Sequence, residues 1–474
     1  MARGLFVFCL ALPLCAQTLV IQHATVITLT AAKPLRDYSV VIEGGRIGLI
    51  QKKLKPPRGA QIIDARGKFL IPGLWDMHMH LGLPEAFFPF LVAHGITGVR
   101  EMYSGIPPQV IQQWRARTDV PRIVASGFLD GPLMLEPGQL PPPGAFAIST
   151  AEQARYAVQA IKLSGYDFIK VYNDLPRDAY FAIAQEAHAL KIPFAGHVPE
   201  AVSPLEASEA GQRSQEHLIN ILLACSTDEA ALRAERIRVM TSAKLSGEER
   251  LRLLGFPKPE GLFDTYSEQK AAALFQTFVR NGTWQTPTLV LLKGFAYGDE
   301  FVKDPLVQKM PESWRATAHP RDKFYMKDLT PDQFDTLVTS IRALLDRYKK
   351  LVGDMHRAGV QFLAGTDTSL TNPVIPGAGL HRELALLVES GLTPREALET
   401  ATLNPARYFG VLDKMGTIEA GKAADLVLLD ADPLTDIRNT EKIGGVVLRG
   451  RYFPRSELDD MLAKVAQLTV APPQ

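Results

Sequence analysis

The middle of the chain alternates short apolar segments with longer helix-like ones, and this alternation constrains the fold more than any other feature. Eight candidate strands can be counted: Gly73–His80, Ile96–Met102, Arg122–Gly127, Asp167–Tyr172, Ile192–Val198, Ser214–Leu218, Thr283–Leu291 and Val360–Thr366. Strands that alternate with helices favour a parallel sheet joined by crossover helices. Eight such strands are the number that a closed (β/α)8 barrel requires.

Both ends of the chain are instead rich in short strand-like runs. Gly44-Gly45 is a hairpin turn signal within residues 17–70, and β-branched apolar runs return at Asp425–Leu429 and Gly445–Leu448. The simplest arrangement joins the two ends in one small composite β-sandwich. We therefore predict an α/β protein: residues 71–410 form a (β/α)8 TIM barrel, and residues 17–70 and 411–474, the last including a tail, form the sandwich.

Residues 1–16 have the pattern of a signal peptide. Arg3 precedes the apolar run Leu5–Leu14, and Ala16 follows it. The run is shorter than the ~20 residues that span a bilayer. A buried N-terminal strand or helix is the alternative, and Cys15 also leaves a lipid anchor open, although Leu14 is large for that signal. We expect a secreted or periplasmic protein without a membrane segment after signal removal.

The charge balance bears on the partners of the protein. With 52 basic and 51 acidic residues, nothing marks a nucleic-acid or polyanion binder. We expect a small-molecule substrate as the partner. The oligomeric state stays open, and a homo-oligomer is one of the alternatives.

Side chains that bind metals stand at the ends of the candidate strands. They are His78 and His80 in the first, Lys170 in the fourth, His197 and His217 in the fifth and sixth, and Asp367 directly after the eighth. Strand side chains alternate, so the two histidines of the first strand point to the same side. Barrel enzymes place their chemistry at the carboxyl ends of the strands. Imidazole and carboxylate groups suit zinc and similar divalent ions, with manganese, cobalt and iron as alternatives.

Lys170 lies within the apolar strand Asp167–Tyr172. An apolar setting disfavours an ammonium group, and most such lysines extend to water or pair with a carboxylate. Burial beside two cations would lower the pKa of Lys170 and leave a neutral amine. Such an amine can react with carbon dioxide to give a carbamate, a two-oxygen ligand able to bridge two metal ions. A carbamate on Lys170 is therefore our hypothesis.

Several longer motifs extend this pattern. They are Ile71–His80 (IPGLWDMHMH), Glu216-His217, Gly365-Thr366-Asp367, Leu392–Leu398, Asn404-Pro405-Ala406 and Gly416–Val427. Together they resemble the amidohydrolase superfamily, in particular its imidazolonepropionase-like and Xaa-Pro dipeptidase-like branch with a carboxylated lysine. The resemblance covers about residues 18–455 and weakens between Leu218 and Val360, where helical insertions are expected.

The resemblance implies a role for each candidate ligand. His78, His80 and Asp367 would hold the more buried of two divalent ions, zinc by default. His197 and His217 would hold the more exposed ion, and carboxylated Lys170 would bridge both. A hydroxide bridging the two ions would be the nucleophile, with Asp367 as the catalytic proton shuttle.

The resemblance favours hydrolysis of an amide or cyclic-amide C–N bond, for example in a dipeptide or an N-acyl amino acid. A phosphotriester or lactone hydrolase with the same dinuclear site is one alternative. An inactive binding protein on the same barrel is another.

Two further residues are candidates for substrate binding. Arg100 ends the second strand, and Tyr172 lies two positions after Lys170 and so faces the same way. Either would suit a substrate carboxylate, although a structural salt bridge or packing at the barrel rim explains each equally well. His94, His188, His356 and His381 lie in helical or loop contexts and are interpreted as structural. The segments 225–280 and 293–355 are expected to be helices and loops that wall the pocket.

Overall fold

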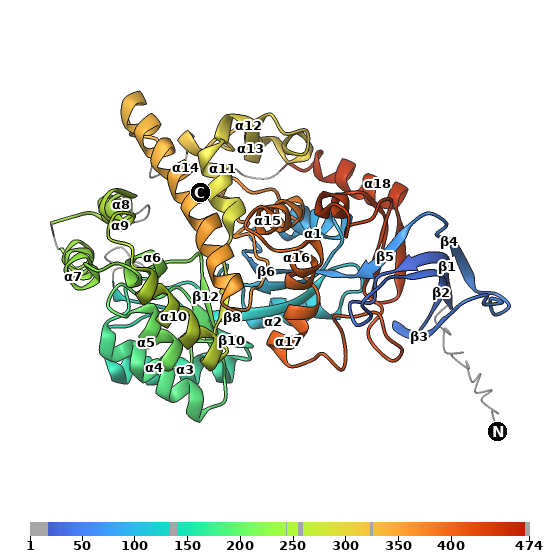
Figure 1. Cartoon of the computed structure of the whole chain (residues 1–474), viewed down its shortest axis with the longest axis horizontal. Helices are drawn as coiled ribbons and strands as arrows, with labels where there is room; N and C mark the ends of the chain where they lie inside the picture. The colour runs from blue at the N-terminus through green and yellow to red at the C-terminus, as the bar shows by residue number, and fades with distance from the viewer. Residues whose placement is uncertain (1–17, 133–139, 243, 255–258, 323–325, 470–474) are drawn as a thin grey trace, which may run out of the picture.

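The computed structural model describes residues 18–132, 140–242, 244–254, 259–322 and 326–469. The predicted signal peptide, residues 1–16, lies outside the described residues. Figure 1 shows two parts: a barrel surrounded by helices, and a separate sheet that contains the first strands of the chain. The boundaries predicted at residues 70/71 and 410/411 stay predictions.

Seven parallel strands form most of the barrel. In spatial order they are β6 (Leu74–Met79), β7 (Ile96–Glu101), β8 (Arg122–Asp130), β10 (Phe168–Val171), β11 (Phe194–Gly196), β12 (Ser214–Glu216) and β13 (Trp284–Thr286). The short β9 (Ala145–Ala147) pairs with β8 outside this path. Parallel strands of this kind need crossover connections, which the helices supply.

The predicted eighth strand, Val360–Thr366, completes the ring without forming a regular strand. On one side Gln285 N donates to Gln361 O over 3.0 Å, and Leu363 N donates to Gln285 O over 2.9 Å. On the other side Met77 N donates to Ala364 O over 2.9 Å. The segment therefore lies between β13 and β6, and the predicted barrel architecture is confirmed.

One strand prediction is partly wrong. The segment Thr283–Leu291 was expected to be a strand throughout, but β13 ends at Thr286 and helix α11 (Leu289–Ala296) follows. Pro287 has no amide to donate to a sheet, and Thr288 turns the chain with a φ of +50°. The apolar residues that follow Thr288 form a continuous run. Such a run lacks the hydrophobic periodicity that distinguishes a strand from a helix, so the sequence alone could not place the end of the strand.

Helices cover the outside of the barrel and supply its insertions (Figure 1). Those that follow the barrel strands include α1 (Pro84–Ala93), α2 (Pro108–Ala116), α3 (Ala151–Ser164), α4 (Arg177–Ala189), α5 (Pro204–Glu209), α10 (Glu268–Asn281), α14 (Pro331–Arg357) and α15 (Ala378–Glu389). The others are α6 (Ile221–Ala224), α7 (Glu229–Met240), α8 (Gly247–Leu254), α9 (Pro259–Leu262), α11, α12 (Gly298–Val302), α13 (Glu312–Arg315), α16 (Pro394–Thr400), α17 (Leu403–Phe409) and α18 (Arg455–Val465). The segments 225–280 and 293–355 are thus largely helical, as expected.

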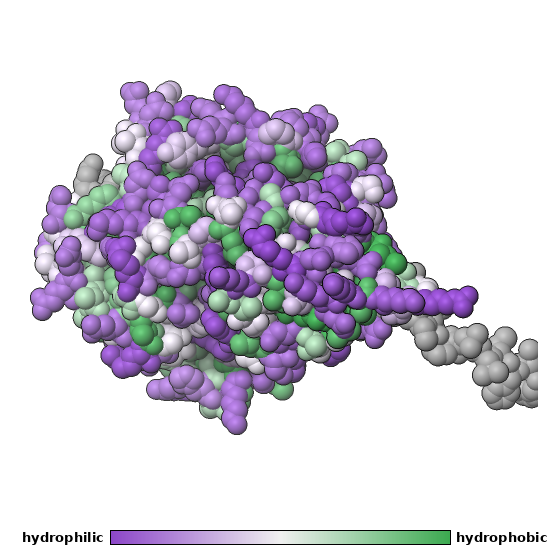
Figure 2. Space-filling model, turned by 45° about the vertical axis from the view of Figure 1, so that its right-hand side comes forward, coloured by the Kyte–Doolittle hydropathy of each residue, from purple (hydrophilic) through white to green (hydrophobic). Residues whose placement is uncertain are grey.

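Local sequence signals explain where several of these helices begin. Thr150 and Gln153 form a reciprocal capping box at α3, and Thr330 and Gln333 form another at α14. Helix α3 ends at Gly165, which has the left-handed conformation that a glycine adopts without strain. No described helix is long and apolar enough to cross a membrane. Figure 2 shows polar residues over most of one face, with apolar residues in small separate groups.

The second sheet joins the two ends of the chain, as predicted. Its order is β16 (Arg451–Pro454), β15 (Ile443–Leu448), β14 (Leu426–Leu429), β5 (Phe69–Pro72), β1 (Leu19–Val26), β2 (Leu35–Glu43) and β3 (Arg46–Gln51), with β4 (Gln61–Asp64) paired to β1. The antiparallel pair β5–β14 connects the two ends. Gly44 and Gly45 form the predicted hairpin turn with positive φ angles. The sheet has its own apolar core.

Candidate metal centre

The structure brings the six predicted ligands together at the carboxyl ends of the barrel strands. The imidazole centroid of His78 lies 5.8 Å from that of His80 and 4.4 Å from that of His217. His197 lies 4.7 Å from His217. Lys170 Nζ lies 5.2 Å from the ring of Tyr172, which in turn packs 4.0 Å from His197. Residues far apart in sequence thus meet because parallel strands end at one edge.

Three of these residues form a compact donor cluster. The ligand atoms of His78, His80 and Asp367 all lie within 4.8 Å of one another. Asp367 Oδ1 is 3.1 Å from His80 Nε2 and 3.4 Å from His78 Nε2. His78 Nε2 is fully buried and makes no hydrogen bond within the described residues. A buried polar atom normally has a hydrogen-bond partner. A buried imidazole nitrogen without one is therefore suited to bind a metal ion.

All four histidines are held in the same manner. Each one uses Nδ1 for a hydrogen bond to a protein oxygen: His78 to Glu216 Oε2 (2.8 Å), His80 to Tyr103 O (2.6 Å), His197 to Asn173 Oδ1 (2.8 Å) and His217 to Thr288 Oγ1 (2.7 Å). The oxygens that face His78, His80 and His197 belong to a carboxylate, a backbone carbonyl and an amide, which can only accept, so the proton of each of these rings is on Nδ1. The Thr288 hydroxyl can also accept, which gives His217 the same tautomer. This leaves the Nε2 lone pairs free. Metal-binding histidines typically have such an outer partner, which fixes the ring and its tautomer.

The partner of His78 belongs to a buried ionic network. Glu216 also accepts hydrogen bonds from Arg100 Nη2 over 2.8 and 2.9 Å, and from Ser214 over 2.5 Å. Arg100 donates further to Met77 O, Ser214 Oγ and Tyr408 Oη. Burial alone would raise the pKa of Glu216, but Arg100 and His78 hold it far below its usual value. Glu216 is therefore an ionised acceptor that orients His78.

This geometry corrects the prediction that Arg100 binds a substrate carboxylate. Its side chain is 0% exposed, and its donors point to Glu216, Ser214, Tyr408 and a backbone carbonyl. Burying an arginine requires a compensating anion, which Glu216 provides. The alternative reading from the sequence, a structural salt bridge, is the one that the structure supports.

Burial favours the neutral form of three of the ligand imidazoles, those of His80, His197 and His217. It lowers the pKa values of His80 and His197, and it lowers that of His217 to about 3. Burial also lowers the pKa of the Lys170 ammonium, against the opposing effect of Asp367. Asp367 Oδ1 faces Nε2 of His80 and of His78, and an aspartate carboxylate is ionised at neutral pH. Neutral imidazoles and an ionised carboxylate are the forms that bind metal ions.

The backbone around the centre adopts unusual conformations. Tyr103, His217, Thr288 and Asp367 have φ angles of +81°, +62°, +50° and +55°. Non-glycine residues rarely adopt positive φ, and such positions gather at functional sites where neighbouring structure maintains them. Gly365, in the Gly-Thr-Asp motif, is required here because a Cβ would lie 2.8 Å from the backbone nitrogen of His78. The closing segment that precedes Asp367 can therefore approach strand β6, which carries His78.

Several supporting residues were not predicted individually. Asp76 accepts hydrogen bonds from Thr366 Oγ1 (2.6 Å) and Thr366 N (3.1 Å), and so ties the first strand to the closing segment. Asp76 and Glu216 belong to the recognised motifs, so a signal existed for both. Asn173 and Thr288 follow strands without any motif, and no sequence pattern announces them.

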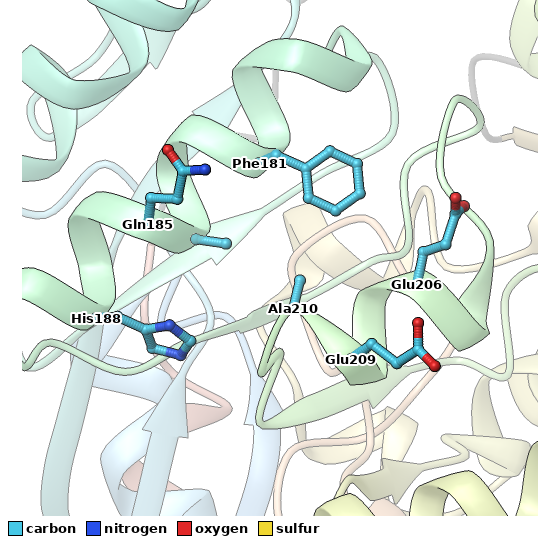
Figure 3. Close-up of a pocket in the computed structure, with 7 residues that line it drawn as sticks. Phe181, Gln185, His188, Glu206, Glu209 and Ala210 are labelled. Carbon is cyan, nitrogen blue, oxygen red and sulfur yellow. The ribbon is translucent and has the colours of Figure 1, made fainter.

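The remaining histidines lie elsewhere. His381 uses both ring nitrogens, towards Thr440 Oγ1 and His94 O, and His94 Nδ1 contacts Phe90 O. His188 lines a groove of about 430 Å³ on the outside of the barrel between α4 and α5 (Figure 3). The other lining residues include Phe181, Gln185, Glu206 and Glu209, and none of them belongs to the metal centre. Tyr172, half-buried beside His197, remains the candidate for substrate contact.

Fold and site together define a barrel protein with a histidine-rich centre at the strand ends and a composite sheet built from both chain ends. Residues 325–452 match the amidohydrolase family. Imidazolonepropionase from Thermoplasma volcanium is 38% identical over 81 residues, 17% of this chain and 19% of that protein. The chain thus spans only about a fifth of the length of the first curated relatives that it matches.

Solved structures show the same fold over nearly the whole chain. A Xaa-Pro dipeptidase with bound methionine has a TM-score of 0.63 at 18% identity, covering 92% of this chain and 100% of that one. A bottromycin amidohydrolase has a TM-score of 0.69 at 24% identity, covering 96% and 91%. The amidohydrolase resemblance inferred from the motifs is confirmed; carboxylation of Lys170 stays a prediction.

Proposed function

We propose that this protein is a metal-dependent hydrolase that cleaves an amide or cyclic-amide C–N bond, for example in a dipeptide or an N-acyl amino acid. The observation that carries the proposal is the convergence of four imidazoles whose Nδ1 atoms are all engaged by protein oxygens. The ligand atoms of His78, His80 and Asp367 lie within 4.8 Å of one another, and the rings of His217 and His197 pack beside them. The amidohydrolase match of residues 325–452 agrees with it.

The donor set fits two divalent ions. His78, His80 and Asp367 would hold one ion, and His197 and His217 would hold the other. A carbamate on Lys170, formed from carbon dioxide, would bridge them. When bound, two such ions lower the pKa of a shared water and polarise a carbonyl group. Zinc is the first choice for ligands of this type.

Asp367 is the proposed proton shuttle. An aspartate carboxylate is ionised at neutral pH and can accept the proton of the attacking water. Asn372 Nδ2 donates to Asp367 O over 2.7 Å and to Oδ2 over 3.2 Å, which holds the carboxylate in position. As the water oxygen bonds to the carbonyl carbon, Asp367 takes the proton. It then delivers this proton to the leaving nitrogen as the C–N bond breaks.

The proposal has three further parts. Tyr172 would contact the substrate, because its half-buried ring lies beside His197. Export to a secreted or periplasmic location is proposed from the sequence of residues 1–16. Small molecules are the proposed partners, with a homo-oligomer as one alternative for the assembly.

A metal analysis combined with a substrate screen tests the proposal. Protein loaded with zinc would be assayed against dipeptides, N-acyl amino acids, cyclic amides, lactones and phosphotriesters. We expect turnover of amides that chelators abolish and zinc restores. Turnover of only the lactones or phosphotriesters would overturn the amide assignment, and turnover of none of the panel by fully loaded protein would favour a binding protein.

A further inference from the structure

We propose that Glu383, on helix α15, is a positioning residue that frees Thr288 to orient His217. The inference rests on the proposed metal centre and extends it to a residue outside the ligand set and its direct partners. It depends on a conflict between two tasks that Thr288 would otherwise have to perform.

Thr288 occupies the N-cap position of α11, immediately before Leu289. Threonine is a favoured N-cap residue because its side-chain oxygen accepts a hydrogen bond from the first free amides of the helix. Here Thr288 makes no such side-chain cap, and its backbone is left-handed at φ +50° and ψ +43°. Its Oγ1 lies instead 2.7 Å from His217 Nδ1. The hydroxyl is therefore used for the candidate ligand and not for the helix.

Glu383 caps the helix in place of Thr288. Its Oε2 accepts the amide of Val290 over 2.7 Å, in the first turn of α11. The backbone amides of Leu289 and Thr288 also interact with this carboxyl group. Because α15 packs directly on α11, the carboxyl group reaches the helix from a neighbouring element.

The environment of Glu383 makes this contact unusual. The side chain is 0% exposed, and burial raises its pKa to about 8. A carboxyl group costs free energy in such a place unless it satisfies groups that would otherwise be unpaired. The unpaired amides at the start of α11 are such groups. A β-branched residue at positive φ, such as Thr288, also persists only where neighbouring contacts maintain it.

The test is the affinity of purified protein for zinc, measured by competition with a chelator and independent of turnover. Outer partners of metal-binding histidines typically change metal affinity by about 10- to 100-fold. We expect Glu383→Leu and Thr288→Val each to weaken the more exposed ion by about that factor, while the ion at His78, His80 and Asp367 is bound as in the parent. Glu383→Gln, which keeps an accepting oxygen, should restore most of the affinity.

The double variant Glu383→Leu/Thr288→Val separates positioning from general stability. If Glu383 acts through Thr288, the double variant binds the exposed ion no more weakly than Thr288→Val alone. The inference would be overturned if the losses of zinc affinity in the two single variants multiplied in the double variant, or if the variants lost both ions equally. Glu389→Leu is the matched control, since Glu389 is an exposed residue of the same helix that pairs with Lys349. If Glu383→Leu does not fold, Glu383→Asp takes its place, because it withdraws the carboxyl group by one methylene. Its zinc affinity is then measured alone and together with Thr288→Val.

The outcome for the parent protein keeps this inference distinct from the proposed function. A parent that binds fewer than two ions contradicts the dinuclear centre, and the inference falls with it. A parent that binds two ions, with Glu383→Leu equal to it in zinc affinity, contradicts the inference alone.

Discussion

Replacing Arg100 with methionine tests whether this side chain pairs with Glu216 behind the metal centre or contacts a substrate. Arg100 and Glu216 are both 0% exposed, and Arg100 Nη2 lies 2.8 and 2.9 Å from the two carboxylate oxygens. Methionine fills similar space without charge, so Glu216 would keep a buried and uncompensated negative charge. Removing one partner of a buried ion pair typically costs about 3–5 kcal/mol, a large part of the about 5–15 kcal/mol that stabilises a domain.

The assay is urea unfolding of the metal-free protein, followed by tryptophan fluorescence. With an m-value near the upper end of about 1–3 kcal/mol/M, the midpoint should fall by roughly 1–2 M. The double variant Arg100→Met/Glu216→Gln should recover much of this loss, because it removes the unpaired charge and keeps an acceptor for His78. Arg117→Met, in the exposed pair Arg117–Asp119, should cost less than about 1 kcal/mol. If Arg100→Met unfolds like the parent and only raises KM, the assignment is refuted and Arg100 binds substrate.

Three further predictions concern individual side chains. Asp367→Asn should lower kcat by about 10²- to 10⁴-fold with at least one ion still bound, and near-parent turnover in that variant would exclude Asp367 as the shuttle. Lys170→Ala should lose metal, measured by elemental analysis, and unchanged stoichiometry and activity would rule out the bridge. Glu383 has its pKa raised from 4.5 to about 8, so the folded chain keeps a proton that the unfolded chain releases. Its contribution to stability is complete below about pH 4.5 and is lost as the pH rises through 8. Glu383→Gln should therefore gain stability relative to the parent between pH 5 and pH 8.5 in urea unfolding, and a constant difference would contradict the raised pKa.

The sequence predicted the barrel, and it placed the candidate ligands at the strand ends, because both depend on local patterns. Strand ends are readable from apolar runs, and a polar residue at such an end, as with His197 after Phe194–Gly196, is a strong signal. The same logic failed for Thr283–Leu291, where an apolar run without a period continues into helix α11.

Partners contributed by distant elements were beyond the sequence. Glu383 lies on a helix far along the chain, and only the packing of α15 on α11 brings it to Val290. Arg100 was placed at the correct strand end, but its role depends on burial, which a strand-end position does not reveal. A charged residue at a barrel strand end faces either the cavity or the core, and the contact with Glu216 decides between them.

A crystal structure of zinc-loaded protein, with anomalous data at the zinc edge, tests the proposed dinuclear centre directly. We expect two peaks, one among His78, His80 and Asp367 and one beside His197 and His217, with density for a carbamate on Lys170 between them. A fully loaded crystal with no peak among these residues, or with zinc bound only elsewhere on the chain, would contradict the proposed centre.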